Sequence, residues 1–193
     1  MQKKPYRHMP DVNMGYYMLR TIQKKDYRDM YEYGRDHDVT KYLSWGPFEH
    51  EKEAKIAIKD IFYPRLRQGL PRGYAIIDIK KQKMIGTIDF HTKPKGVCGA
   101  EIGYVIHKDY WNQGIMTQAL LHMIKIGFDI LHYDVMWIKH IRQNIASQKV
   151  IEKTPFQHIK TERMRIVKKD AVIDDDLLVY ELTKERYHDH QQS

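Results

Sequence analysis

The chain has 193 residues, 42% of them hydrophobic and 11% aromatic, which is enough for one compact domain with a buried core. No stretch approaches the roughly 20 apolar residues of a membrane-spanning helix, and residues 1–13 lack the apolar core of a secretory signal, so we expect a cytoplasmic protein. The single cysteine, Cys98, excludes an internal disulfide and a CxxC motif, and we expect it to be a buried or partly buried spectator. A net charge of +8 favours polyanionic partners such as nucleic acid, a ribosome surface or a phosphorylated cofactor.

The first half of the chain predicts three strands and two helices. The strands are expected at residues 16–22, 74–79 and 84–91, and the last two form an antiparallel hairpin across residues 80–83. The first helix carries Tyr27, Met30, Tyr31 and Gly34. After a loop at residues 44–47, the second helix presents an apolar stripe made of Ala54, Ile58, Ile61 and Phe62.

The second half of the chain places a long helix between two strands. Residues 100–107 (AEIGYVIH) are typical of a strand, residues 114–130 of a helix and residues 135–141 (VMWIKHI) of the next strand. A short helix at residues 143–153 and strands at 157–168 and 177–183 follow. The order indicates mixed α and β structure, with hairpin-linked strands early and one strand–helix–strand crossover in the middle.

The segment DYWNQGIMTQAL, residues 109–120, joins the central strand to the long helix. An aromatic pair is followed by Asn112, Gly114 and the hydroxyl of Thr117, just where helical spacing begins. A tight turn into a helix exposes unpaired backbone N–H groups at the positive end of the helix dipole. Such a junction is suited to a phosphate or pyrophosphate, although the same residues also suit a plain helix start without a ligand.

A resemblance to a known family is carried by five segments in this order: LRTIQKKDYRDMYEYGRDHDVTKYLSWGP, IGTIDFH, AEIGYVIHKDYWNQGIMTQAL, NIASQKVIEKTPF and DDLLVYELTKERY. On these segments the chain resembles the GNAT superfamily of acetyl-CoA-dependent N-acetyltransferases, and within it the RimJ/RimL-like enzymes that acetylate N-termini of ribosomal proteins. The resemblance implies a single GNAT domain at residues 15–184, between a polar N-terminal tail (1–14) and a flexible C-terminal tail (185–193). It implies an α/β fold with a central, mostly antiparallel twisted sheet of about seven strands, about four flanking helices, and a splayed strand pair at the acetyl-CoA site.

The resemblance also implies which residues contact acetyl-CoA. The backbone of residues 113–116 would cradle the pyrophosphate, Thr117 would bind a phosphate oxygen, and backbone groups on the splayed strand would bind the pantetheine arm. The implied cofactor-binding residues are Tyr104, Val105, Ile106, Asn112, Gln113, Gly114, Ile115, Met116, Thr117, Asn144 and Ser147. The chain departs from the family where Asn112 replaces a glycine and Met116 replaces a small residue. Asparagine tolerates left-handed backbone angles, whereas the Met116 side chain has to point away into the helix packing to leave the turn open.

Acetyl transfer to an amine needs a base, a donor to the developing oxyanion and stabilisation of the leaving thiolate. The resemblance places Glu101 near the acetyl group, so it is the first candidate for the base, although an ordinary strand-surface carboxylate would look the same. By the same resemblance, a backbone N–H polarises the thioester carbonyl, Asn144 holds the pantetheine or the strand gap, and Ser147 donates a hydrogen bond to the CoA sulfur. Asn144 and Ser147 also suit a helix cap. Three further residues are weaker candidates for the base: Asp89, His91 and His107.

The acceptor is predicted in outline. Trp45 lies in a loop that the resemblance places beside the acceptor channel, where it would contact the substrate together with Glu101, although plain core packing also fits it. The N-terminus of a ribosomal protein is the first interpretation of the acceptor; a polyamine or aminoglycoside, and a non-catalytic acetyl-CoA- or RNA-binding module, are the alternatives. Residues 174–176 (DDD) could attract a polycation but are expected in a solvated loop before the last strand. We expect no metal, no membrane association, and a monomer or homodimer.

Overall fold

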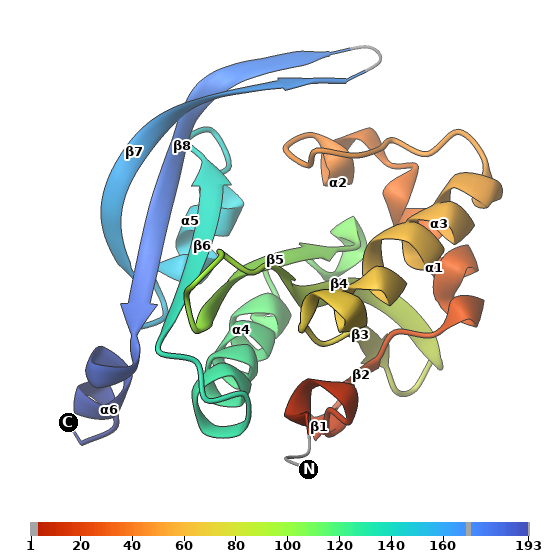
Figure 1. The fold of residues 1–193 in the computed structure, drawn as a ribbon. Coiled ribbons are helices and arrows are strands. Elements are labelled where there is room, and N and C mark those ends of the chain that lie inside the picture. Colours follow the sequence, from red (N-terminus) through yellow and green to blue (C-terminus); the bar gives the residue numbers. More distant parts are fainter. Residues whose placement is uncertain (1–3, 169–170, 193) are drawn as a thin grey trace.

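The computed structural model describes residues 4–168 and 171–192, and these build one sheet of eight strands (Figure 1). The strands are β1 (Val12–Asn13), β2 (Tyr17–Thr21), β3 (Tyr74–Asp78), β4 (Lys83–Thr92), β5 (Gly99–Ile106), β6 (Val135–Ile141), β7 (Gln157–Val167) and β8 (Val172–Thr183). Their order across the sheet is β1-β2-β3-β4-β5-β6-β8-β7. The pairings are antiparallel except that of β5 with β6, which is parallel because α4 crosses over between them.

Six α-helices are present in the described part of the chain. They are α1 (Tyr27–Gly34), α2 (His37–Thr40), α3 (Glu51–Ala57), α4 (Ile115–Lys125), α5 (Ile145–Ile151) and α6 (Lys184–Gln192). Two of them continue into a π-helical turn, α3 at Ile58–Phe62 and α4 at Ile126–Ile130. Short 3₁₀ turns lie at Pro5–Arg7, Lys24–Asp26, Tyr63–Gln68 and Lys108–Tyr110. Among the described residues, no helix is long and apolar enough to cross a membrane.

The sheet is covered on both faces, and each face has its own core. One face packs against α4, whose Leu120 and Met123 belong to the same core cluster as Ile102 of β5. The other face packs against α1 and α3, with Tyr33 and Val105 in a second cluster. Because side chains alternate along a strand, neighbouring residues of β5 point into different cores. In Figure 1, α1 and α3 lie to one side of the sheet and α4 lies below β5.

β5 and β6 part halfway along their length. The parallel pairing ends where Ile102 lies opposite Ile138. Beyond that point β5 stays paired with β4 as far as Ile106, and β6 stays paired with β8 as far as Ile141. Each strand is therefore held by its other neighbour, and a V-shaped gap opens between them (Figure 1). The predicted splayed strand pair is confirmed.

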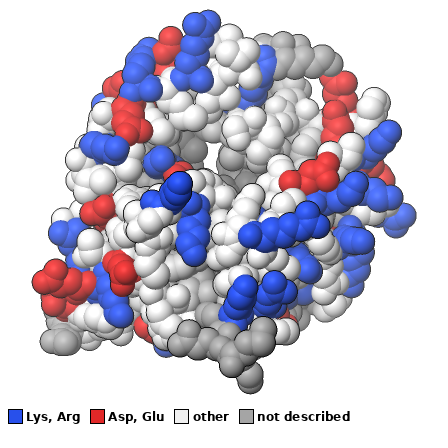
Figure 2. Space-filling model, in the orientation of Figure 1, with Lys and Arg blue, Asp and Glu red and all other residues white. Residues whose placement is uncertain are grey.

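The β7–β8 hairpin extends past the body of the sheet and bends back above the gap (Figure 1). Near its tip, the Lys168 ammonium donates to the carbonyl of Thr40 at the end of α2. Along β7, Met164 and Ile166 are half-buried, whereas Arg163 and Arg165, which alternate with them, are exposed. Figure 2 shows that the surface is hollowed beneath this hairpin. The hairpin thus covers the side of the sheet on which the gap opens.

The predicted fold class is confirmed, with more elements than the sequence indicated. The additional strand, β1, lies within the predicted N-terminal tail, where Val12 pairs with Leu19 of β2. Residues 1–3 of that tail lie outside the described residues. The additional helices are α2 and α6, and α6 stands where a flexible tail was predicted at 185–193, of which residue 193 also lies outside the described residues.

Three local predictions are wrong. Ile61, predicted to lie in the apolar stripe, is 42% exposed, because the π-helical turn at Ile58–Phe62 changes the spacing. Residues 174–176, predicted in a loop, lie inside β8, where ion pairs with Arg163 compensate the charges of two of the three aspartates. Cys98, predicted to be buried or partly buried, is exposed.

The helix α6 docks through one aromatic residue. Tyr187 is only 6% exposed, and its ring stacks on Phe128 with centroids 4.7 Å apart. Its hydroxyl donates to the Asp129 carboxylate at 3.2 Å. The segment is otherwise polar, so its composition alone indicates a tail.

Replacing Tyr187 with alanine tests whether α6 is docked. Tyr187→Ala is expected to lower the free energy of unfolding by about 3 kcal/mol, because it leaves a cavity and removes the stacking on Phe128. The exposed neighbour His188 provides the matched control, and His188→Ala should change that free energy by less than about 0.5 kcal/mol. Urea unfolding of both variants measures the difference; equally small effects would restore the tail prediction.

Candidate active site

The turn between β5 and α4 has the backbone of an anion site. Asn112 and Gly114 both adopt left-handed conformations, with φ of 59° and 74°. Gly114 is the N-cap of α4, and no side chain caps the helix. The first N–H groups of α4, at residues 115–117, are therefore left for a ligand at the positive end of the helix dipole.

The two departures from the family pattern are accommodated by the structure. Asn112 supplies the left-handed backbone angle that a glycine supplies in the family, as asparagine does more readily than other side-chain-bearing residues. Met116 is 6% exposed and belongs to the same core cluster as Ile115 and Leu120. Its side chain points into the packing of α4, so the turn stays open.

Side chains of the turn hold its shape. The Gln113 amide donates to the carbonyl of Asp109 at 2.8 Å and accepts from the Tyr17 hydroxyl at 3.4 Å. The Trp111 indole donates to the carbonyl of Ile106 at 2.9 Å. The Gln113 side chain therefore has a structural role, and its predicted contact with a ligand falls to its backbone.

The backbone of β5 faces the gap at alternate residues. The N–H of His107 donates to Ile85 of β4 at 2.7 Å, so the backbone groups of Val105, two residues earlier, face β4 as well. Those of Tyr104 and Ile106 face the gap instead. Because the Ile106 carbonyl is taken by Trp111, the groups left for a ligand are the N–H and C=O of Tyr104 and the N–H of Ile106. The geometry favours these two residues over Val105, which was also predicted.

A hydrogen bond crosses the gap between the two strands. The Tyr104 hydroxyl lies 2.7 Å from Ser147 Oγ and 3.3 Å from the Ser147 carbonyl. Tyr104 belongs to β5, whereas Ser147 belongs to α5, the helix that follows β6. Asn144 is the N-cap of α5, and its side chain accepts from the Ser147 N–H at 3.1 Å. The pair Asn144 and Ser147 does cap the helix, as one of the two readings of the sequence proposed.

The Tyr104 hydroxyl keeps its proton. Burial raises the pKa of this phenol well above its usual value, and the hydrogen bond to Ser147 offsets only part of that rise. Either hydroxyl can be the donor in this pair; when the protonated Tyr104 donates to Ser147 Oγ, the proton of Ser147 is free to donate to another acceptor. Sequence reasoning missed this role of the Tyr104 side chain, although the two-residue period of β5 places it on the face opposite Glu101.

Glu101 lies on the other face of β5, between two nitrogen-bearing side chains. Its Oε2 is 2.9 Å from Lys139 Nζ, and its Oε1 is 3.6 Å from His91 Nε2. The pairing of β4 with β5 shifts register around His91, and a Cβ on Gly103 would lie 2.7 Å from the His91 ring. The bulge and the glycine together make room for the imidazole beside the carboxylate. Lys139 was missed from the sequence, because its contact with Glu101 depends on the parallel pairing of β5 with β6.

The two other base candidates lie elsewhere. Asp89 is buried and forms an ion pair with Arg65 at 2.8 Å, which is a structural role. His107 lies 3.7 Å from a Glu32 carboxylate at the end of β5 that is farther from Glu101. In residues 4–168 and 171–192 no three His, Cys, Asp or Glu side chains are grouped as metal ligands, and the absence of a metal stays a prediction.

Trp45 packs against Phe48 in the same loop and against α1. Its ring stacks on Phe48 with centroids 5.0 Å apart and planes 16° apart. A Cβ on Gly34 of α1 would lie 3.3 Å from the Trp45 ring, so the loop rests closely on α1. This geometry favours the core-packing interpretation, and the contact of Trp45 with a substrate stays a prediction.

Comparison with known proteins identifies the family. Residues 17–157 match the model of the acetyltransferase (GNAT) domain. The chain is 28% identical over 169 residues to the uncharacterized N-acetyltransferase p20 of Bacillus licheniformis, covering 88% of this chain and 93% of that protein. It also resembles the crystal structure of a GNAT-family acetyltransferase from Bacillus anthracis, with a TM-score of 0.75, 23% identity and coverage of 91% of this chain and 99% of that one.

Two further solved structures share the fold at lower identity. The ribosomal-protein-S5-alanine acetyltransferase of Vibrio fischeri has a TM-score of 0.74 at 16% identity, covering 92% of this chain and 98% of that one. The spermidine N-acetyltransferase of Vibrio cholerae, solved with CoA and spermine, has a TM-score of 0.74 at 14% identity, covering 90% of this chain and 98% of that one. At such identities the likeness shows the fold alone.

Substitutions at Asn112 test the backbone requirement of the turn. Asn112→Gly should bind acetyl-CoA at least as tightly as the unmodified protein, because glycine adopts positive φ without strain. Asn112→Val should weaken binding about tenfold, because a β-branched residue pays roughly 1–2 kcal/mol in this conformation. Calorimetric titration measures both affinities, and thermal melting checks folding. Weaker binding by Asn112→Gly, or unchanged binding by Asn112→Val, would contradict this account.

The match to the family model spans the parts of the chain that build the gap. It begins with the first residue of β2, includes the turn before α4 and the N-terminus of α5, and ends at the first residue of β7. It thus contains both sides of the split between β5 and β6. The chain belongs to the acetyltransferase (GNAT) domain family, and it is an acetyl-CoA-dependent N-acetyltransferase.

Proposed function

We propose that the protein acetylates the α-amino group of a peptide or protein N-terminus, by direct transfer while both substrates are bound. The observation that carries this choice of acceptor is the ion pair of Glu101 with Lys139 at 2.9 Å. This ion pair balances the negative charge of Glu101, the candidate base. A cationic acceptor would therefore find little electrostatic attraction at the site. An α-amine, with a pKa near 8, is partly neutral at physiological pH, whereas a lysine amine near 10.4 is almost fully charged.

Three sets of groups act on the reacting atoms from different directions. Glu101, on one face of the sheet, accepts the proton of the amine through a water molecule. A backbone N–H of Tyr104 or Ile106, at the edge of the gap, stabilises the negative oxygen as nitrogen bonds to the acetyl carbon. On the opposite face, Ser147 donates its hydrogen bond to the sulfur as the carbon–sulfur bond breaks. Bound acetyl-CoA supplies the acetyl group, and its pyrophosphate would occupy the turn before α4.

The positions of the acidic residues favour a peptide acceptor over a polyamine acceptor. A triamine or tetramine needs several carboxylates near the base. Two aspartates in the acidic run of β8, however, already form ion pairs with arginines. Asp174 and Asp176 form ion pairs with Arg163, and Asp176 also pairs with Arg142. A ribosomal-protein acetyltransferase and a spermidine enzyme both share the fold, so a ribosomal N-terminus and a polyamine are the two competing acceptor classes.

A non-catalytic module is the weaker alternative. Its main support in the sequence was Met116, whose side chain would have closed the turn. Since Met116 packs into the core, the turn is open to a pyrophosphate.

The acceptor class is tested by release of free CoA thiol from acetyl-CoA. We expect turnover with peptides that have a free N-terminus, none with the same peptides blocked by N-formylation, and less than about one tenth of the peptide rate with spermidine. Faster turnover of spermidine, or of a lysine in a blocked peptide, would contradict the proposal. Glu101→Gln should lower kcat by about 100-fold or more, and Glu185→Gln on the exposed part of α6 should not.

Tyr104 and Ser147 are expected to act as one unit. Tyr104→Phe and Ser147→Ala should each lower kcat about tenfold with little change in the KM for acetyl-CoA, because each removes about one hydrogen bond that acts on the leaving sulfur. The double variant should be no slower than the slower single variant, because the phenol acts only through the serine. Additive losses in this cycle would mean that Tyr104 has a separate role.

A further inference from the structure

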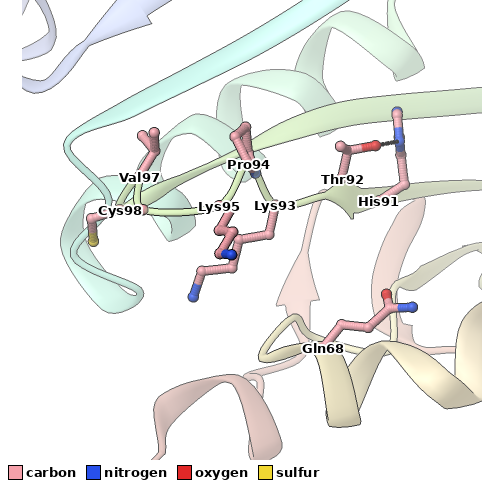
Figure 3. A pocket seen from close by; sticks show the side chains of 9 residues that line it. Gln68, His91, Thr92, Lys93, Pro94, Lys95, Val97 and Cys98 are labelled. Atoms are coloured by element: carbon pink, nitrogen blue, oxygen red, sulfur yellow. Dashed lines mark hydrogen bonds between the residues drawn. The ribbon is translucent and has the colours of Figure 1, made fainter.

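A surface cavity of about 740 Å³ lies at the turn between β4 and β5, beside the Glu101 cluster. Its lining includes His91, Lys93, Lys95, Cys98 and, from the segment before β3, Gln68. In Figure 3, Lys93 and Lys95 both extend from the turn toward the side on which Gln68 lies. The cavity is therefore walled by the β4–β5 turn on one side and by the end of the 3₁₀ turn at Tyr63–Gln68 on the other.

The charge of this cavity is positive and uncompensated. Its lining contains two lysines and no aspartate or glutamate. Within the described residues, neither Lys93 nor Lys95 has a carboxylate at ion-pair distance, whereas Lys83, Lys108 and Lys139 each have one. Lys93 reaches across the cavity, since its Nζ lies 3.5 Å from where a Cβ on Gly69 would be. Figure 2 shows lysine and arginine side chains gathered around the centre of the visible face. An anionic group entering here would gain two ammonium contacts.

The cavity is next to the candidate base. His91 lines the cavity and also lies 3.6 Å from Glu101. Glu101 is three residues from Cys98, which lies just before β5, so the two are at most about 10 Å apart along the chain. About three residues of an extended peptide cover the same distance. An acceptor whose amine is at Glu101 can therefore place one of its residues two to four in the cavity.

We propose that this cavity binds an acidic side chain of the acceptor, so that the preferred acceptors are peptides with aspartate or glutamate among their residues two to four. The proposal rests on the proposed function, because it needs an α-amine at Glu101. Lys93 and Lys95 attract the carboxylate, and the same charges repel a polyamine. The cavity therefore favours acidic peptides over polyamines as acceptors.

Two peptides of equal length test the specificity, one with Asp or Glu at positions two to four and one with Asn or Gln at the same positions. In the unmodified enzyme, kcat/KM should be about tenfold higher for the acidic peptide, and Lys93→Gln with Lys95→Gln should reduce this ratio to about twofold or less. The amide peptide should react equally well in both. Lys52→Gln with Lys80→Gln, which removes two exposed charges from α3 and the β3–β4 turn, is the matched control and should keep the ratio. A ratio near one in the unmodified enzyme, or an equal fall in both double variants, would overturn the proposal.

Cys98 gives a second readout that does not depend on turnover. It is the only cysteine in the sequence, it is exposed, and it lines the cavity, so its alkylation by iodoacetamide reports whether the cavity is occupied. An N-acetylated acidic peptide, which cannot be an acceptor, should slow alkylation several-fold, and it should not do so in the variant lacking Lys93 and Lys95. The N-acetylated amide peptide should give no protection in either protein.

The two readouts separate failure of this proposal from failure of the proposed function. If no peptide amine is acetylated but the acidic peptide still protects Cys98, the acceptor assignment is wrong and the anion site stands. If peptide amines are acetylated without an acidic preference and without protection of Cys98, the proposed function stands and the anion site is overturned.

Discussion

The end of the β5–β6 pairing at Ile102 is the constraint on which the rest of the molecule depends. A sheet interior normally satisfies every backbone N–H and C=O, yet beyond Ile102 the groups of Tyr104 and Ile106 turn toward a gap. The gap persists because β4 holds β5 and β8 holds β6. Trp111 satisfies one of the carbonyls from outside the sheet. What is left is a set of backbone groups without a sheet partner, the N–H and C=O of Tyr104 and the N–H of Ile106, which suits an amide-bearing chain such as pantetheine.

Because side chains alternate along β5, the candidate functional groups of this strand lie on different faces of the sheet. Glu101 and Tyr104 are three residues apart, so their side chains lie on opposite faces of the sheet while the backbone between them borders the gap. Here the base meets Lys139 and His91, and the donor meets Ser147. In the proposed reaction, the incoming amine and the departing thiolate would therefore lie on separate sides of β5, and this one strand would position both.

Much of this arrangement could be predicted from the sequence, because it depends on local pattern. Alternating residues indicated β5, and the order of Asn112, Gly114 and helical spacing indicated the turn. Contacts between distant residues could not be predicted in this way: Tyr104 and Ser147 are 43 positions apart, and Lys139 meets Glu101 only in the observed register. Charged and polar composition led to two wrong predictions, in both cases because the contact that decides the structure is with a residue far away in the sequence. The acidic run at 174–176 lies in a strand because arginines face it, and polar α6 is docked with Tyr187 stacked on Phe128.

The central claim is that the split strand and the turn before α4 together hold acetyl-CoA. Backbone amide hydrogen exchange, measured with and without acetyl-CoA, tests it most directly, because it reports each N–H separately. We expect slower exchange at Tyr104 and Ile106 and at residues 115–117 when acetyl-CoA is added, with Val105 unchanged because its N–H already faces β4. Protection confined to other segments, or equal protection of Val105 and its neighbours through general stiffening, would contradict the account.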